Sequence, residues 1–201
     1  MRAYFIVGLL AMACAFTSCD ESKKLAGQLQ GTWTGAPDKL VDDHTSTSSY
    51  IPAYTFVKDN DKNGGSVTVN ALITASGSID GSTAIVTPFS LSASGEAIIT
   101  GTWQATDDDE IALILDTNAI DLAVDPDAVV VSVNTIGETS QPAIDSLKPQ
   151  IVDVIQRQMT QAIRNKMLTI KRIDDIKIKN GFMSCEINDH DYTFQRQALP
   201  Q

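Results

Sequence analysis

The chain is 201 residues long, with 15 Lys and Arg residues against 25 Asp and Glu residues and a net charge of −10 at pH 7. A chain this acidic lacks the basic face that nucleic-acid binding needs, so no nucleic-acid partner is expected. Its three cysteines, Cys14, Cys19 and Cys185, are too few for a disulfide framework. Length and composition therefore indicate one acidic globular domain with a sizeable core.

The first 18 residues have the layout of an export signal. Arg2 places one positive charge ahead of an uncharged run over 3–18, which ends in small residues. This run is shorter than the roughly 20 apolar residues that a membrane-spanning helix needs. We therefore predict a signal peptide over 1–18 that is removed from the mature protein.

The residues that close this run point to a lipid anchor. Phe16, Thr17 and Ser18 lead directly into Cys19. The arrangement resembles a bacterial lipobox, in which the cysteine is acylated and becomes the new N-terminus, although Phe16 stands where leucine is usual. Cys14 is a weaker second candidate, and an ordinary secretory signal with a chance cysteine is the alternative. We predict lipidation at Cys19, with palmitate-type chains that anchor the protein in a membrane.

A polar stretch over 19–26 is predicted to form the lipidated tether. Asp20 and Glu21 directly follow the cysteine. Such acidic residues resemble the surface-export signal of lipoproteins in the Bacteroidetes group, whereas an Asp in this place would retain an enterobacterial lipoprotein in the inner membrane. The predicted location is the cell envelope, at the outer membrane, with the membrane face left open.

The remaining residues, 27–201, are predicted to form a single mainly β domain. Short runs of alternating apolar and polar residues recur between turn signals, which is typical of an antiparallel sandwich or barrel. Before the first helical segment, strands are predicted at 29–35, 50–58, 66–74, 82–92, 96–106, 110–116 and 128–134.

The hydrophobic period then changes to that of a helix. Apolar residues from Ile144 to Ile163 fall on one face and charged residues on the other, which predicts one long amphipathic helix over about 142–168. Asn180 and Gly181 separate two alternating runs, a strong hairpin signal. The helix is thus inserted before the last three predicted strands, at 176–179, 182–187 and 192–197.

The triplet Gly-Thr-Trp occurs twice, at 31–33 and at 101–103. It resembles the Gly-x-Trp signature of lipocalins and of small lipocalin-like domains on Bacteroidetes lipoproteins, over roughly 27–135. The resemblance implies an antiparallel barrel or half-barrel, with Trp33 packed across its bottom. Two features depart from that pattern: the helix precedes three strands and not one, and the strands outnumber the eight of a lipocalin barrel.

One loop matches the first half of a calcium-binding loop. Asp59, Asp61, Asn63 and Gly64 have the required spacing, but the bidentate Glu at the twelfth position is replaced by Asn70. We therefore predict a hairpin turn here and no metal site.

No other cluster predicts an enzyme. The acidic run 107–110 is interpreted as solvated charge, and a hydrolase built on its carboxylates is a minor alternative. His44 and His190 lack metal-ligand spacing with another His or Cys. Cys185 lies at an alternating strand position, which predicts a buried inert thiol. No cofactor is expected.

The function that this reasoning favours is a non-enzymatic binding module, in which the apolar interior or mouth of the barrel holds a small hydrophobic ligand. The alternative is a structural lipoprotein with a solid core, which displays a surface to another envelope protein. A filled barrel interior would count against a ligand inside it.

Overall fold

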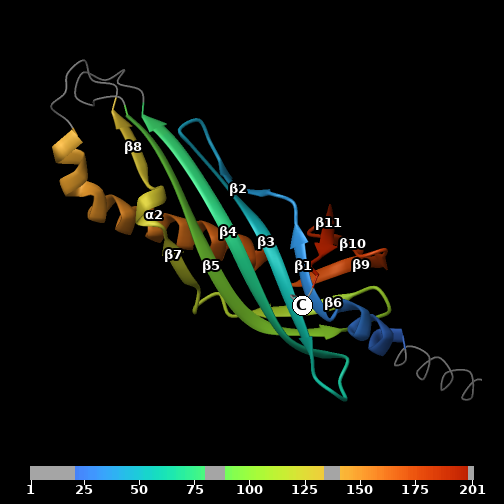
Figure 1. Cartoon of the computed structure of the whole chain (residues 1–201). Coiled ribbons are helices and arrows are strands. Elements are labelled where there is room, and N and C mark those ends of the chain that lie inside the picture. The colour runs from blue at the N-terminus through green and yellow to red at the C-terminus, as the bar shows by residue number, and fades with distance from the viewer. Residues whose placement is uncertain (1–20, 80–88, 134–140, 199–201) are drawn as a thin grey trace, which may run out of the picture.

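The computed structural model describes residues 21–79, 89–133 and 141–198, which form strands, two helices and a short 3-10 turn (Figure 1). The helices are a segment at 21–29 and α2 (Gln141–Thr169), and the turn is η1 (Pro126–Ala128). The strands are β1 (Gly31–Gly35), β2 (Asp38–Asp42), β3 (Ser46–Lys58), β4 (Gly64–Ile79), β5 (Phe89–Ala105), β6 (Ile111–Leu115), β7 (Asp121–Val124), β8 (Val130–Val133), β9 (Arg172–Lys179), β10 (Phe182–Ile187) and β11 (His190–Arg196).

Eight of these strands close an antiparallel barrel, in the order β1-β11-β10-β9-β6-β5-β4-β3. Pairing between β1 and β3 completes the circle, with Trp33 opposite Tyr54. The other strands lie outside it, because β2 pairs with β3 while β7 and β8 pair with β5. The predicted mainly β fold, with a barrel and one long helix before the last three strands, is confirmed.

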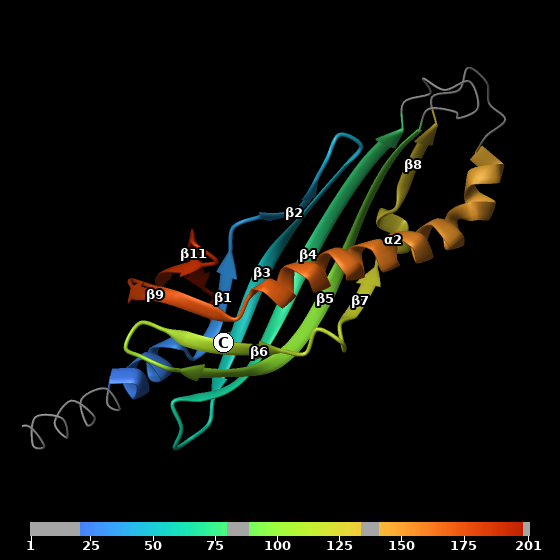
Figure 2. The same cartoon turned by 180° about the vertical axis from the view of Figure 1, so that it is seen from behind.

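Three strands run on beyond the barrel. β3, β4 and β5 continue as a twisted sheet, which we call the extension, bordered by β2 on one side and by β7 and β8 on the other. The helix α2 crosses the inner face of this sheet, as Figure 2 shows from behind. The molecule is therefore elongated, with the helix at 21–29 at one end and the start of α2 at the other.

Aromatic side chains fill the closed barrel. Trp33, Tyr54, Phe56, Trp103 and Phe194 are all nearly inaccessible to solvent. Two pairs of these rings pack edge to face, with centroids 5.4 Å apart for Phe56 and Trp103 and 5.6 Å apart for Tyr54 and Phe194. Such contacts add to the stability that burial already gives. The barrel interior is a packed core.

The start of the described chain differs from the prediction. Residues 21–29 form a helix where a polar tether over 19–26 and the first residue of a strand over 29–35 were predicted. Leu25 and Leu29 stand four residues apart and are buried with Ala26 against the end of the barrel. The indole of Trp33 donates to the Leu29 carbonyl at 2.7 Å, and the Arg196 guanidinium covers the Trp33 ring at 4.5 Å. This end of the barrel is thereby closed.

The strand boundaries also differ in the extension. The predicted strands 82–92 and 96–106 both overlap one continuous strand, β5 (Phe89–Ala105), while residues 82–88 of the first prediction lie outside the described part of the chain. Residues 93–95, between the two predicted strands, are part of β5. A Cβ at Gly95 would lie 2.8 Å from the Ala123 carbonyl oxygen of β7, so the close approach of the two strands favours glycine there. β4 runs five residues past its predicted end, to Ile79. The short strands β2 and β7 were not predicted.

Candidate functional site

The inner face of the three long strands changes character where they leave the barrel. Side chains at that face alternate along each strand, and inside the barrel they are large, as at Tyr50 and Ile73. In the extension most of them become small, although Phe89 and Leu91 on β5 are large. The inner-face residues there include two register-matched rows, Ser48, Ala75 and Ala93 in the first and Ser46, Gly77 and Leu91 in the second.

The helix opposite this face has one apolar spine with a residue at every fourth position. Its members are Leu147, Ile151, Ile155, Met159, Ile163 and Met167. The spine is buried from Ile155 to Met167, but Ile151 is only half-buried and Leu147 is 48% exposed. The helix thus packs tightly beside the barrel and progressively less tightly over the extension.

A groove lies between the helix and the small residues of the sheet. Its volume is ≈ 910 Å³, within the roughly 300 to 1,000 Å³ that is usual for small-molecule sites. Leu91, Val131 and Val133 line one wall, and α2 lines the other from Leu147 to Ala162. Among the described residues that line the groove, none is charged; Gln150, Gln158 and several hydroxyls supply its polar groups.

A polar cluster lies at the junction between groove and barrel. The Asp38 carboxylate on β2 forms an ion pair with Lys166 of α2 at 2.8 Å. The Tyr192 hydroxyl donates to the same carboxylate oxygen at 3.1 Å, and the Tyr50 hydroxyl lies 3.5 Å from it. We call Asp38, Lys166, Tyr50 and Tyr192 the junction cluster. It ties the helix to the edge of the sheet one turn beyond Ala162.

Partial burial sets the electrostatics of the junction cluster. Burial alone would raise the pKa of Asp38, but the hydrogen bond and charge of Lys166 hold that pKa below its ordinary value. Burial likewise opposes the charge of Lys166, and the contact with Asp38 raises its pKa. Both groups are therefore charged at neutral pH. The Arg164 guanidinium also donates to the Thr117 carbonyl at 2.9 Å, and this contact joins the helix to the segment between β6 and β7.

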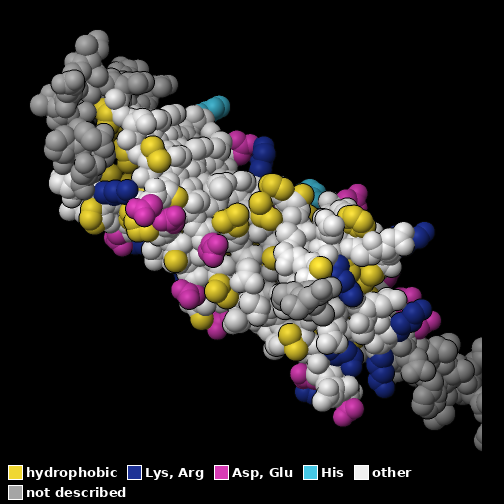
Figure 3. Space-filling model, in the orientation of Figure 1, with side chains coloured by type: hydrophobic (Ala, Val, Ile, Leu, Met, Phe, Trp, Pro, Cys, Tyr) yellow, Lys and Arg dark blue, Asp and Glu magenta, His cyan; other side chains and the backbone are white. Residues whose placement is uncertain are grey.

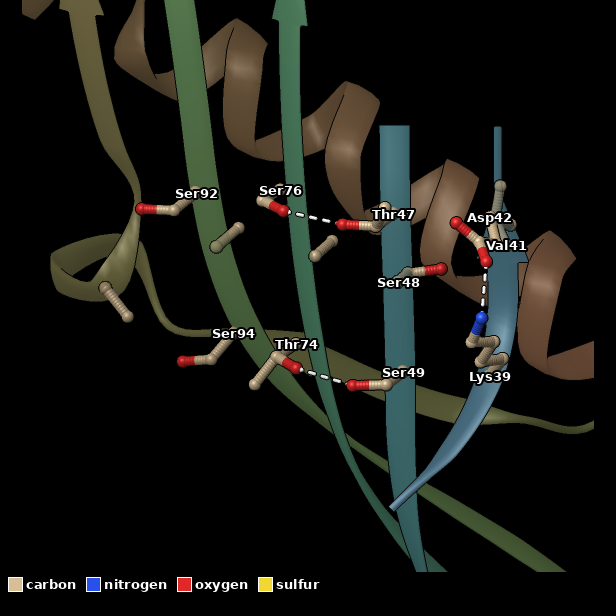
Figure 4. A pocket seen from close by; sticks show the side chains of 13 residues that line it. Lys39, Val41, Asp42, Thr47, Ser48, Ser49, Thr74, Ser76, Ser92 and Ser94 are labelled. Carbon is tan, nitrogen blue, oxygen red and sulfur yellow. Dashed lines mark hydrogen bonds and ion pairs between the residues drawn. The ribbon is translucent and has the colours of Figure 1, made fainter. Parts of the chain in front are cut away.

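The outer face of the same extension carries a polar trough of ≈ 540 Å³ (Figure 4). Two hydroxyl rows cross it, Thr47 beside Ser76 and Ser49 beside Thr74, with oxygens 2.8 and 3.0 Å apart. Over this part of the molecule the surface in Figure 3 is largely uncharged, with scattered hydrophobic side chains. The hydroxyls bond to each other in register, so the trough is an ordinary solvated sheet face.

The loop that resembles half a calcium site is a hairpin turn, as predicted. The Asp59 carboxylate pairs with Lys62 at 3.1 Å, and the Asn63 amide donates to the Ala105 carbonyl at 2.7 Å. A Cβ at Gly64 would lie 2.3 Å from the Trp103 carbonyl, so this close approach of two strands needs glycine. Its polar groups are used to hold the turn.

The remaining candidate residues do not converge on one site. Glu110 lies 3.7 Å from Arg172 at the end of the barrel, and burial together with the neighbouring Asp108 raises the pKa of Asp109. His44 is exposed between β2 and β3, and a ring nitrogen of His190 lies 3.0 Å from the Asp189 carbonyl. Among the described residues, no three His, Cys, Asp or Glu side chains are grouped to hold a metal ion.

The cysteine predictions have different outcomes. Cys185 is buried in the barrel as a free thiol, and burial raises its pKa to about 12, which confirms the predicted buried thiol. Cys19 and Cys14 lie outside the described residues, so lipidation stays a prediction from the sequence.

Comparisons with protein-family models, with curated proteins and with solved structures find no match for this chain. The likeness to lipocalin-like lipoproteins therefore stays an inference from the two Gly-Thr-Trp triplets. None of the helices in the described part of the chain is long and apolar enough to cross a membrane.

The groove itself was not located from the sequence. Its floor is built mainly from Ser, Ala and Gly residues. Ser and Gly are typical of turns and Ala is a weak strand former, so β4 was predicted too short. The helix sequence did indicate a second apolar contact, because Leu147 and Val154 extend its apolar face beyond the part that packs beside the barrel. An apolar stripe longer than its expected partner is the feature that could have indicated a groove.

Proposed function

We propose that this protein is a lipid-anchored envelope protein that holds a small apolar ligand in the groove between α2 and the extension. The observation that carries the proposal is the half-exposed apolar spine of α2 over a floor of small side chains. Burying the apolar spine stabilises the protein, but Leu147 is 48% exposed, so part of the spine is still in contact with water. A ligand in the groove would complete it.

We place the proposed ligand at the mouth of the barrel and not in its interior. The barrel interior was one of two predicted places for the ligand, and aromatic side chains fill it. The mouth was the other, and the groove begins there, beyond the junction cluster. The ligand is therefore proposed to lie outside the closed barrel and under the helix.

The binding experiment uses the chain from residue 20 onwards, because the contacts that build the barrel and the groove are made between residues 21 and 198. Titration with the uncharged fluorescent probe phenylnaphthylamine should give saturable emission with one probe per chain. Ala75→Trp fills the floor of the groove and should abolish the signal. Thr74→Trp places the same ring on the outer face of the same strand and should leave it unchanged.

Two results would contradict the proposal. One is the absence of saturable emission from the unsubstituted protein. The other is emission that survives in Ala75→Trp, because the probe would then be bound elsewhere. In that case an interaction role with a solid core would replace the binding role.

The membrane anchor is tested separately with the full chain in its source cells. Cys19→Ala should move the protein from the membrane fraction to the soluble fraction and remove the lipid mass from its N-terminus. Cys14→Ala is the matched control and should change neither. Membrane association that persists in Cys19→Ala, with Cys14→Ala soluble, would place the lipid on the other cysteine.

A further inference from the structure

We infer that the groove takes the hydrocarbon tail of a lipid lengthwise, with its polar head outside, and that the small row of Ser48, Ala75 and Ala93 sets how long a tail fits. The inference rests on the proposed function and adds the chemical class of the ligand and the residues that select it.

The first support is the shape of the groove. Its lining follows α2 from Leu147 to Ala162, a distance of about 22 Å at the helical rise of 1.5 Å per residue. The facing sheet is twisted, as Figure 2 shows, so the direction of its strands changes relative to α2 along the length of the groove. A flexible linear chain can follow such a path, whereas a rigid fused-ring body cannot.

The second support is the chemistry of the lining. The described lining residues include no Asp, Glu, Lys or Arg, although the chain as a whole has a net charge of −10. A charged ligand group inside the groove would lose its hydration without gaining an ion-pair partner, at high cost. The charge or polar head of the ligand is therefore placed outside, and only its hydrocarbon part inside.

The third support is that the groove has a defined inner end. Ser48, Ala75 and Ala93 lie side by side in register, and the next inner-face row towards the barrel has the large residues Tyr50 and Ile73 on β3 and β4, beside Gly95 on β5. The ion pair between Asp38 and Lys166 closes the same place from the side of α2. A tail that enters the groove therefore ends over Ser48, Ala75 and Ala93, where Tyr50 and Ile73 block further entry.

The test measures the affinity of the chain from residue 20 for uncharged monoacylglycerols of increasing tail length, by displacement of phenylnaphthylamine. Affinity should rise about fourfold for each added methylene, the value expected for burial from water, and then stop rising when the tail reaches the inner end. A soluble sterol derivative should compete poorly at the same concentrations.

Ala75→Leu adds bulk to the row at the inner end and should move the plateau to shorter tails by two or more methylenes. Thr74→Leu, on the outer face of β4, should leave the plateau where it is. Each variant is first shown by its unfolding curve to be folded, so that a shift in tail length reports on the groove.

The outcomes separate this inference from the proposed function. If the probe binds and is lost in Ala75→Trp, but the sterol competes better than the acylglycerols or tail length has no effect, this inference is overturned while the binding function stands. A plateau that stays in place in Ala75→Leu also overturns it. If the probe does not bind the unsubstituted protein, the proposed function fails as well.

Discussion

The closed barrel and the extension are built from the same three strands, yet they bury their inner faces in different ways. Inside the barrel, β3, β4 and β5 present Phe56, Val69 and Ile99, all buried. In the extension the same faces present mostly Ser, Gly and Ala, with Phe89 and Leu91 on β5, and α2 covers them. Side-chain size along one strand thus separates a region that supplies stability from a region that leaves room for a ligand.

The largest difference between the two regions should appear when a phenylalanine is truncated in each. Phe56→Ala in the barrel should lower the free energy of unfolding by about 3 to 5 kcal/mol, because it leaves a cavity in a packed core. Phe89 lines the groove and is only half-buried. Phe89→Ala should therefore lower the free energy of unfolding by only about 1 kcal/mol. Urea unfolding of both variants measures the difference, and equal costs would contradict the division into two regions.

The junction cluster joins the two regions, and its removal should have the next largest effect. Lys166→Met leaves the partly buried Asp38 carboxylate without its ion-pair partner, which should cost about 1 to 3 kcal/mol of unfolding free energy. Adding Asp38→Asn should restore part of that loss. Lys39→Met is the control, because the pair of Lys39 with Asp42 is exposed and should contribute little. A control as costly as Lys166→Met would show that the junction has no special role.

Acid should weaken the same junction. The pKa of Asp38 in the folded protein lies below its ordinary value of 3.8, so the folded state prefers the charged form and the unfolded state takes up the proton first. The contribution of Asp38 to stability is therefore complete well above pH 3.8 and is lost as the pH falls through and below that value. Unfolding midpoints between pH 6 and pH 3 should fall less steeply in Asp38→Asn than in the unsubstituted chain.

Thiol labelling should separate the regions without changing stability. In the chain from residue 20, Cys185 is the sole cysteine, and its burial with a pKa near 12 should make it inert to a thiol reagent at pH 8 until the barrel unfolds. A cysteine introduced by Ala75→Cys, in the half-buried floor of the groove, should react in the folded protein, and phenylnaphthylamine should slow that reaction. Rapid labelling of Cys185 in the folded chain would show that the barrel opens readily.

Sequence reasoning performed well where packing gives a clear period. The helix predicted over about 142–168 is α2 at Gln141–Thr169, and the hairpin at Asn180 and Gly181 forms with both residues at positive φ, as its turn type requires. Trp33 lies across the end of the barrel, beneath Arg196. These elements carry large apolar residues or obligatory turn residues, so their local pattern and their final contacts agree.

The candidate site could not be predicted in the same way, because the groove exists where large side chains are missing from the sheet face. Ala75, Gly77 and Ala93 read as weak strand or turn residues, and nothing local shows that a helix from another part of the chain lies above them. The junction between Asp38 and Lys166 joins residues far apart in the chain. Only the tertiary arrangement shows that an incompletely buried helix face and a small-residue sheet face meet.

The central claim, that the groove under α2 holds a hydrocarbon chain, is tested most directly by photocrosslinking. A monoacylglycerol with a diazirine near the end of its tail is bound to the chain from residue 20, irradiated, and its attachment sites are read by peptide mass spectrometry. If the groove holds the tail, labels are expected on α2 between Leu147 and Ala162 and on the inner faces of β3, β4 and β5 in the extension. Labels on the outer hydroxyl rows, or on the aromatic core of the barrel, would contradict it.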